Sequence, residues 1–460
     1  MSPAVLAHLA PGYQASGFSP GLVIYLTVAG LVVMALALRV SWATPRFGAL
    51  AGDDPAGPVA PIPDDSTASP TEPGAWPGER LPGAVRIGLR AVGLFGLAFL
   101  LLCGWAGSPQ IGVNLLWIAM FSEFWIGGQL LSLLIGDWWR LIDPFDTIAG
   151  WIAPGPTTGD ADEPTTGDAD DEHGDWWVPA ALLFSFAWMW LAWEGGRATI
   201  RPNATWLTLY LVVMVAGAAL GGRGWVRRNE AFAVTFGLVA SISPVDWSGQ
   251  RPHVRNPLGR NAEHRVTKRE AAVLAVLAGT VLFDALGSTR WWADFVGTRS
   301  INELTAFSTG GMVWLMISAG VVWIAAARLA TWAAGTERGV DSWALAGPLA
   351  GTVAGFAVAH EINSLLTNSQ SFLALLSDPL AKGWDLIGTI RIVTNPYLLS
   401  AGAQAWVSLA LIEVAVLVSY LGLHDRCVAR FGAAGTRATW AALGFMLVAA
   451  VVGLKLLVGV

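Results

Sequence analysis

The sequence predicts an all-α integral membrane protein. Of its 460 residues, 54% are hydrophobic and only 13% are charged, and the mean hydropathy is +0.54. Soluble domains carry about 25% charged residues, so a chain of this composition could not cover its surface in water. We therefore expect one polytopic transmembrane domain that spans residues 1–460.

Ten hydrophobic runs come close to the roughly 20 residues that a helix needs to cross a bilayer. The first run has no basic residue before it and Arg39 near its end, a pattern unlike a signal peptide. We therefore expect about ten transmembrane helices. The runs are 21–40, 87–107, 111–134, 177–194, 204–220, 270–287, 309–334, 343–366, 404–423 and 440–457.

Three connecting segments have a distinct composition. Residues 43–86 and 154–176 are acidic and rich in Pro, Thr and Gly, with too few apolar residues to fold, so we expect disordered loops. Residues 221–269 form a basic loop in which the apolar segment 230–244 is too short to cross a bilayer. We expect that segment to be re-entrant or interfacial.

Lys and Arg residues predict the orientation. Most of them lie in the loops that follow the odd-numbered runs, and the segment 223–269 contributes the largest share. Cytoplasmic loops are enriched in these residues. The pattern therefore predicts a multi-pass protein of the cytoplasmic membrane, with all three loops inside and both termini outside.

The run 343–366 changes character before it ends. It is almost entirely apolar up to Ala359, and His360, Glu361, Asn363 and Ser364 then follow. Ionisable groups at membrane depth are costly, so they usually pair or line a cavity. Helical spacing places His360, Asn363 and Ser364 on one face and Glu361 about 100° away. Polar side chains also hold helices together without further function, and we favour that role for Asn363 and Ser364.

Other polar residues interrupt apolar runs, and the predicted orientation places most of them between the midplane and the outer face. His360, Glu361 and Asp284 are the candidate catalytic residues, because an imidazole beside carboxylates can accept a proton. The candidate ligand-binding residues are Asn114, Glu123, Asn363, Ser364, Asp378, Asp385 and Glu413.

Two ionic clusters are expected at the inner face. Asp137, Arg140 and Asp143 close the third run, and Asp425 lies between His424 and Arg426 at the end of the ninth run. Aromatic anchoring and a helix stop at Pro144 explain the first cluster as well as a lipid-phosphate site does. We therefore interpret both clusters as interfacial.

A metal site is a weaker hypothesis. Zinc sites use three or four ligands, commonly several His or Cys, and only one of the six His residues lies inside a run. Cys103 and Cys427 lie in different segments without CxxC spacing. A mixed site of His360 with carboxylates stays open, so the cofactor is unknown.

Seven stretches occur in order along the chain and resemble one family. They are Ala7-His8, GDWWRLIDPF from Gly136, NEAFAVTFGLVASISP from Asn229, LFDALGSTRWW from Leu282, VAH from Val358, LLSDPLAKGWDLIGT from Leu375 and HDR from His424. Together they resemble the fenitrothion hydrolase-like family of bacterial and archaeal polytopic membrane proteins.

The resemblance implies an inner-membrane protein, linked in some members to hydrolysis of an organophosphorus ester. Two departures weaken a shared histidine mechanism: Glu361 stands where the family has an aromatic residue, and Val416 stands where it has a His. The positions that match are Asp137, Arg140, Asp143, Glu230, Asp284, His360, Asp378, Asp385, His424 and Asp425.

Three function classes follow from these observations. The first, which we favour slightly, is binding or transport of a small molecule or ion at an outward-facing polar site within the membrane. The second is a membrane-embedded hydrolase of organophosphorus-type esters, and the third is a non-catalytic membrane subunit. The expected partners are the lipid bilayer, a small-molecule ligand and, in the third case, another membrane protein. Nucleic acid is not expected.

Overall fold

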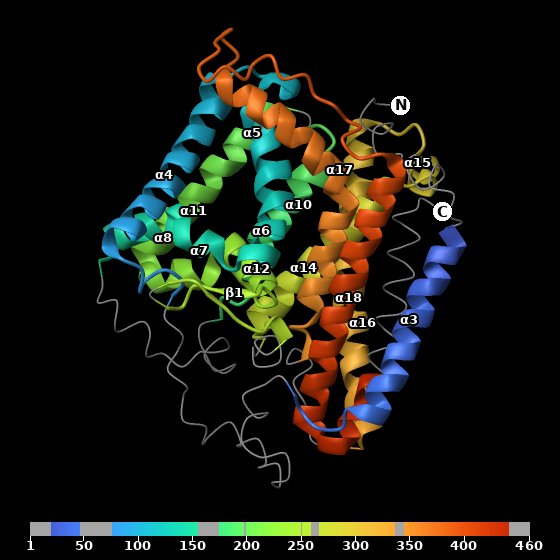
Figure 1. Cartoon of the computed structure of the whole chain (residues 1–460). Coiled ribbons are helices and arrows are strands. Elements are labelled where there is room, and N and C mark those ends of the chain that lie inside the picture. Colours follow the sequence, from blue (N-terminus) through green and yellow to red (C-terminus); the bar gives the residue numbers. More distant parts are fainter. Residues whose placement is uncertain are drawn as a thin grey trace.

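The structure is a computed structural model, and it describes residues 20–46, 76–154, 174–196, 199–249, 251–258, 266–335 and 345–440. Within these residues the chain is mainly helical (Figure 1). Its strand structure among the described residues is one antiparallel pair, β1 (Val245–Asp246) with β2 (His253–Val254). The predicted all-α class is confirmed.

The elements follow one another along the chain as helices of very different lengths. They are α3 (Pro20–Ser41), α4 (Gly83–Ala106), η2 (Ile111–Val113), α5 (Leu115–Ile118), η3 (Ala119–Gly127), α6 (Gly128–Ile135), α7 (Trp138–Ile142), α8 (Pro144–Ile152), α10 (Val178–Ala187), η4 (Trp188–Ala192), α11 (Ile200–Asn229), α12 (Ala231–Ala240), α14 (Lys268–Gly287), α15 (Arg290–Val296), α16 (Ile301–Ala334), α17 (Leu349–Ser377), α18 (Ala401–Phe431) and η6 (Gly432–Ala434).

Seven helices of the described part are long and apolar enough to cross a membrane, which supports a multi-pass membrane protein. Nine of the ten predicted runs fall on described helices. Two of them, the first and the fourth, contain apolar helices shorter than the seven spans, at 28–41 and 178–192. The tenth run, 440–457, lies almost wholly outside the described residues. The seven are 83–106, 115–135, 200–240, 268–287, 301–334, 349–377 and 402–440.

The predicted basic loop 221–269 contains more helix than expected. Helix α11 bends at Gly222 and continues to Asn229. The φ of Gly222 is 73°, a left-handed conformation that glycine adopts more easily than other residues do. Helix α12 follows directly, and nearly all its side chains are buried against other helices because it is apolar on every face. Helix α14 then begins at Lys268 with a capping box between Thr267 and Glu270.

Most of the two predicted acidic loops, 43–86 and 154–176, lies outside the described residues. Their described ends are ordered by ionic contacts or helix formation. Helix α4 already begins at Gly83, and the Asp175 carboxylate accepts hydrogen bonds from Arg269 and Asn229 at 2.8 and 2.7 Å.

Successive long helices run in alternating directions, and the segment 378–400 crosses the end of the bundle between α17 and α18 (Figure 1). An aromatic core that includes Phe124, Phe186, Phe232 and Phe236 joins η3, α10 and α12. Small residues bring other pairs together. A Cβ on Gly355 of α17 would lie 2.3 Å from the Cβ of Ala415 on α18.

Glycine also sets the distance between α14 and α16, which gives a testable prediction. A Cβ on Gly279 would lie 2.3–2.6 Å from three Met316 atoms, two of them backbone, whereas Gly287 of the same helix has nothing within 4 Å. We expect Gly279→Ala to lower the free energy of unfolding by about 1–3 kcal/mol through overpacking. Gly287→Ala should leave it unchanged or raise it by up to about 1 kcal/mol. Thermal denaturation in detergent, followed by size exclusion, compares the two variants, and equal midpoints would contradict this packing.

Candidate functional site

Three ionisable side chains from two helices meet inside the bundle. The Nε2 atom of His360 on α17 lies 3.9 Å from Oδ2 of Asp284 on α14 and 3.7 Å from Oε1 of Glu361. One donor atom from each residue lies within 4.8 Å of the other two. These are the three residues that the sequence names as catalytic candidates, and we call them the His360 cluster.

The surroundings of the His360 cluster orient its imidazole and limit its contact with solvent. The ring is parallel to that of Phe356, one helical turn earlier, at an interplanar angle of 5° and a centroid distance of 6.3 Å. The side chains of Glu361, His360 and Asp284 are 7%, 11% and 18% exposed. Glu361, which helical spacing places about 100° away from the face of His360, nevertheless lies close to His360 itself. Two carboxylates and one imidazole make this site suited to a cation or a proton.

Glu123 does not join the His360 cluster. Both of its carboxylate oxygens accept hydrogen bonds from Ser369 Oγ, at 3.0 and 3.1 Å. Ser369 lies nine residues after His360, which is about 13 Å along α17. Glu123 lies in the π-helical segment η3, an irregular geometry that is frequent at functional sites. Glu413 is half-buried on α18.

Asn114 has a structural role in this fold. Its Oδ1 caps α5 by accepting a hydrogen bond from Leu116 N at 2.9 Å. Its Nδ2 donates to the carbonyl oxygens of Cys103 and Ser108 at 2.8 and 2.7 Å. Because its amide is fully buried and engaged in these bonds, it is not available to a ligand as the sequence suggested.

Asn363 and Ser364 are half-buried on α17, and neither forms a hydrogen bond with another described residue. Asp378 and Asp385 lie beyond the end of α17 and stabilise the loop there. The Asp378 carboxylate accepts hydrogen bonds from the backbone N–H groups of Lys382 and Gly383, each at 2.7 Å. Such bonds are typical of an Asp that stabilises a local turn.

Asp385 accepts from Ser377 Oγ at 2.6 Å, and this hydrogen bond lowers the pKa of its carboxyl. Helix α17 itself ends eleven residues later than the predicted run. Polar residues beyond Leu366 continue the helix because they find partners such as Glu123 and Thr394.

The two ionic clusters expected at the inner face lie in two separate places. Asp137 pairs with Arg140 at 2.9 Å, and Asp143 caps α8 by accepting from Phe145 N at 2.8 Å. The other three residues are on α18, well apart from α7 and α8 in Figure 1. There the His424 ring donates a hydrogen bond to the carbonyl oxygen of Trp42 at 2.9 Å. The Asp425 carboxylate accepts a hydrogen bond from the backbone N–H of Arg46 at 2.6 Å. The Arg426 side chain lies beside Gly347.

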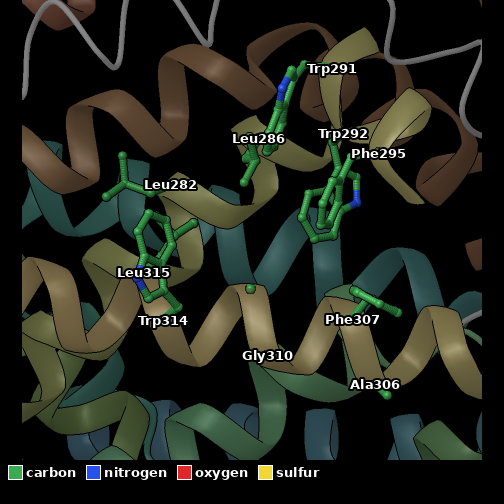
Figure 2. A pocket seen from close by; sticks show the side chains of 11 residues that line it. Leu282, Leu286, Trp291, Trp292, Phe295, Ala306, Phe307, Gly310, Trp314 and Leu315 are labelled. Atoms are coloured by element: carbon green, nitrogen blue, oxygen red, sulfur yellow. The ribbon is translucent and has the colours of Figure 1, made fainter. Parts of the chain in front are cut away.

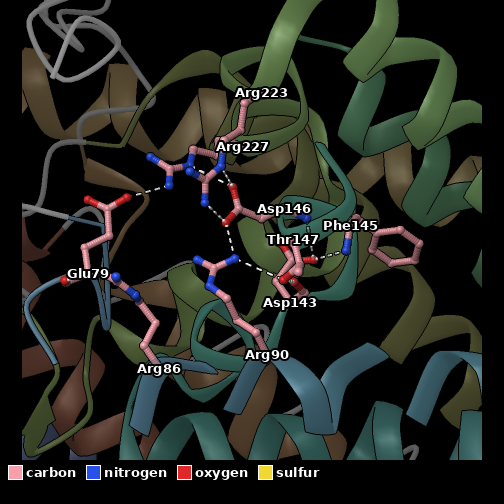
Figure 3. Close-up of polar contacts among 9 residues, drawn as sticks. All are labelled: Glu79, Arg86, Arg90, Asp143, Phe145, Asp146, Thr147, Arg223 and Arg227. Atoms are coloured by element: carbon pink, nitrogen blue, oxygen red, sulfur yellow. Dashed lines mark hydrogen bonds and ion pairs between the residues drawn. The ribbon is translucent and has the colours of Figure 1, made fainter. Parts of the chain in front are cut away.

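Sequence reasoning missed Asp146, which organises the largest ionic cluster of the described residues (Figure 3). Its fully buried carboxylate binds Arg90 at 2.8 Å, Arg223 at 2.5 Å and Arg227 at 2.8 Å. Burial alone would raise the pKa of Asp146, but the hydrogen bonds and charges of Arg223 and Arg227 hold it well below its usual value. The signal in the sequence was Arg90, a cation inside an apolar run that requires an acidic partner.

Glu230 was matched to the family but given no role, and the structure makes it a second buried centre. Its carboxylate accepts hydrogen bonds from Trp139 Nε1 at 3.0 Å, from Phe232 N at 3.2 Å, and from Tyr210 and Ala233 N. It thereby caps α12 and joins α7 and α11 to that helix. These contacts are those of a structural carboxylate.

A groove of about 730 Å³ lies between α14, α15 and α16 and is lined by aromatic and aliphatic side chains (Figure 2). On α14 it is lined by Leu282 and Leu286, which share one helix face. Asp284 is rotated by about 200° from each of them. The groove therefore lies on the opposite side of α14 from the His360 cluster.

Comparison of the chain with models of protein families, with characterised proteins and with solved structures gives no match. The fold and the site therefore define the class on their own: an all-α protein with helices able to span a membrane and an acidic, histidine-containing cluster between two of them.

Proposed function

We propose that this chain is a multi-pass membrane protein that binds a small cation at the His360 cluster and carries it across the membrane. The observation that supports the proposal is the meeting of His360, Asp284 and Glu361 within the bundle. Intramembrane ionisable groups mark ion or proton pathways more often than they serve packing. In this arrangement two acidic groups attract the cation, and the imidazole accepts or releases a proton as the ion enters or leaves.

The finer membrane arrangement is part of the proposal. About ten spans, a re-entrant or interfacial segment at 230–244 and both termini outside the cytoplasmic membrane would place the His360 cluster in the outer half of the bilayer. Opening to the inner side then requires α17 to move against its neighbours. Gly351 and Gly355 support such movement, because without side chains they let α17 slide past Ile242, Ser419 and Ala415, which a Cβ at either position would meet.

A membrane-embedded hydrolase is the second candidate. The observation that favours it is again the imidazole within 4 Å of two carboxylates, an arrangement in which His360 or a carboxylate could act as general base for water. This activity would need no ion gradient. The third possibility, a non-catalytic membrane subunit, would leave the cluster without a measurable activity of its own.

Flux through reconstituted protein tests the proposal. Proteoliposomes containing the full chain would be loaded either with a pH-sensitive dye or with a Zn²⁺ indicator, and external protons or Zn²⁺ would be added. We expect flux above that of empty vesicles, reduced at least tenfold in Asp284→Asn and His360→Ala. The matched control is Asp294→Asn, an exposed Asp whose pair with Arg290 is 3.9 Å long, and it should retain full flux.

Each other outcome has a defined meaning. Wild-type vesicles that pass neither ion overturn the proposal. Turnover in detergent of a chromogenic organophosphorus ester, lost in His360→Ala, would establish the hydrolase in its place. If the wild type has neither flux nor turnover, the subunit interpretation replaces both.

A further inference from the structure

We propose that the His360 cluster is a binding site for a divalent first-row transition metal ion of the Zn²⁺ type. The inference rests on the proposed function, because it names the cation. Three donor atoms would serve as ligands: Nε2 of His360, a carboxylate oxygen of Asp284 and a carboxylate oxygen of Glu361.

The separations of these atoms fit a metal better than they fit a hydrogen-bonded triad. Hydrogen bonds between nitrogen and oxygen span 2.7–3.2 Å, whereas His360 Nε2 lies 3.7 and 3.9 Å from the two carboxylates. Zinc binds nitrogen and oxygen at about 2.0–2.2 Å, so two ligands of a tetrahedral ion lie about 3.4 Å apart. Movements of a few tenths of an ångström would therefore bring the imidazole and each carboxylate to that separation, and the two carboxylates, within 4.8 Å of each other, would close further around the ion.

The donor set indicates which ions fit. Calcium and magnesium prefer oxygen ligands throughout, and copper(I) prefers sulfur. One imidazole with two carboxylates suits Zn²⁺, Mn²⁺, Fe²⁺ or Co²⁺. Two ionised carboxylates would also neutralise a divalent charge, which lowers the cost of holding the ion among apolar helices.

Three protein ligands leave at least one coordination position open. Structural zinc sites are closed by four protein ligands, whereas sites that exchange a ligand or bind water keep a position free. The partial exposure of Asp284 and His360, 18% and 11%, leaves a route for water or for the ion itself. An open site is what a transported or reactive metal requires.

Metal titration of the purified full chain tests the inference directly. After treatment with a chelator, the protein in detergent is titrated with Co²⁺, followed by visible absorption, and with Zn²⁺, followed by calorimetry. We expect one ion per chain, with a cobalt spectrum of low coordination number. Asp284→Asn, His360→Ala and Glu361→Gln should each weaken binding by about 100-fold or more, because losing even an outer-shell partner of a metal ligand costs 10–100-fold.

Controls separate the site from its alternatives. Asp294→Asn should bind as the wild type does, and size exclusion must show each variant folded; Asp284→Glu offers a carboxylate variant that should keep part of the affinity. Zn²⁺ binding that is absent, or unchanged in all three site variants, overturns the inference. If one metal ion binds but no flux is seen, the metal site stands and the transport proposal is overturned. If proton flux depends on His360 but no metal binds, the transport proposal stands and the metal-site inference is overturned.

Discussion

Replacing Asp146 with Asn is expected to lower the free energy of unfolding by about 3–5 kcal/mol, the cost of breaking a buried ion pair by removing one partner. The Asp146 side chain is fully buried, and the three guanidinium groups around it are no more than 19% exposed. Without the carboxylate, Arg90, Arg223 and Arg227 would lose the anion that they share, although Glu79 would still pair with Arg227. Each charge would then be held away from water without sufficient compensation.

The measurement is the thermal midpoint of the purified variant in detergent, followed by size exclusion. Asp294→Asn is again the matched control, since it removes an exposed i,i+4 ion pair worth about 0.3–0.5 kcal/mol. Arg223→Lys is a second test: it keeps the charge but cannot form the paired contacts from Nε and Nη2 that Arg223 makes with Asp146. An Asp146→Asn protein as stable as the Asp294→Asn control would contradict a stabilising role for this cluster.

The same carboxylate adds a pH dependence with a defined sign. Because the folded pKa of Asp146 lies below its usual value of about 3.9, its contribution to stability is complete above that value. The contribution is lost as the pH falls toward the folded pKa. Stability of the wild type should therefore fall more steeply than that of Asp146→Asn below about pH 5. Parallel curves would show that Asp146 carries no such shift.

Apolar run length predicts the helices of this chain well, because a lipid-facing helix must be apolar over its whole length. It fails at ends where polar residues find internal partners. Helix α17 extends to Ser377 because Ser369 binds Glu123 and Ser371 binds Thr394. Similarly, Arg227 and Asn229 continue α11 into the predicted basic loop because they bind Asp146 and Asp175.

The site illustrates a different limit. Residue type and depth were enough to single out His360, Glu361 and Asp284. Their adjacency depends on how α14 packs against α17, which no local pattern contains. Asp146 was missed for the converse reason: an Asp two residues after Pro144 reads as part of a helix start. Its importance comes from three arginines that lie 56–81 residues away in the chain.

Glu230→Ala should be at least as damaging as Asp146→Asn. It would leave four buried donors without their present acceptor: Trp139 Nε1, Tyr210 Oη, and the backbone N–H groups of Phe232 and Ala233. A buried polar group left unsatisfied costs about 1–3 kcal/mol, and loss of a helix N-cap costs about 0.5–2 kcal/mol. We therefore expect a loss of at least about 4 kcal/mol, enough to prevent recovery of folded protein.

Graded variants make this prediction informative even if Glu230→Ala does not fold. Glu230→Gln keeps one acceptor oxygen but turns an amide NH₂ toward the donors, so its midpoint should fall less than that of Glu230→Ala. Tyr210→Phe removes one donor, and also the hydroxyl that Ala231 N uses at 3.0 Å, so a loss of about 1–3 kcal/mol is expected.

The matched control for the Glu230 variants is Glu303→Ala. Glu303 also caps a helix, but its side chain is exposed and is hydrogen-bonded to Ser300. Because the Glu303 side chain is exposed, its loss should lower the midpoint far less than Glu230→Ala does. A Glu230→Ala protein recovered with the same yield and midpoint as Glu303→Ala would mean that α12 is held by its apolar packing alone. The carboxylate network that joins α7, α11 and α12 would then carry none of the stability assigned to it.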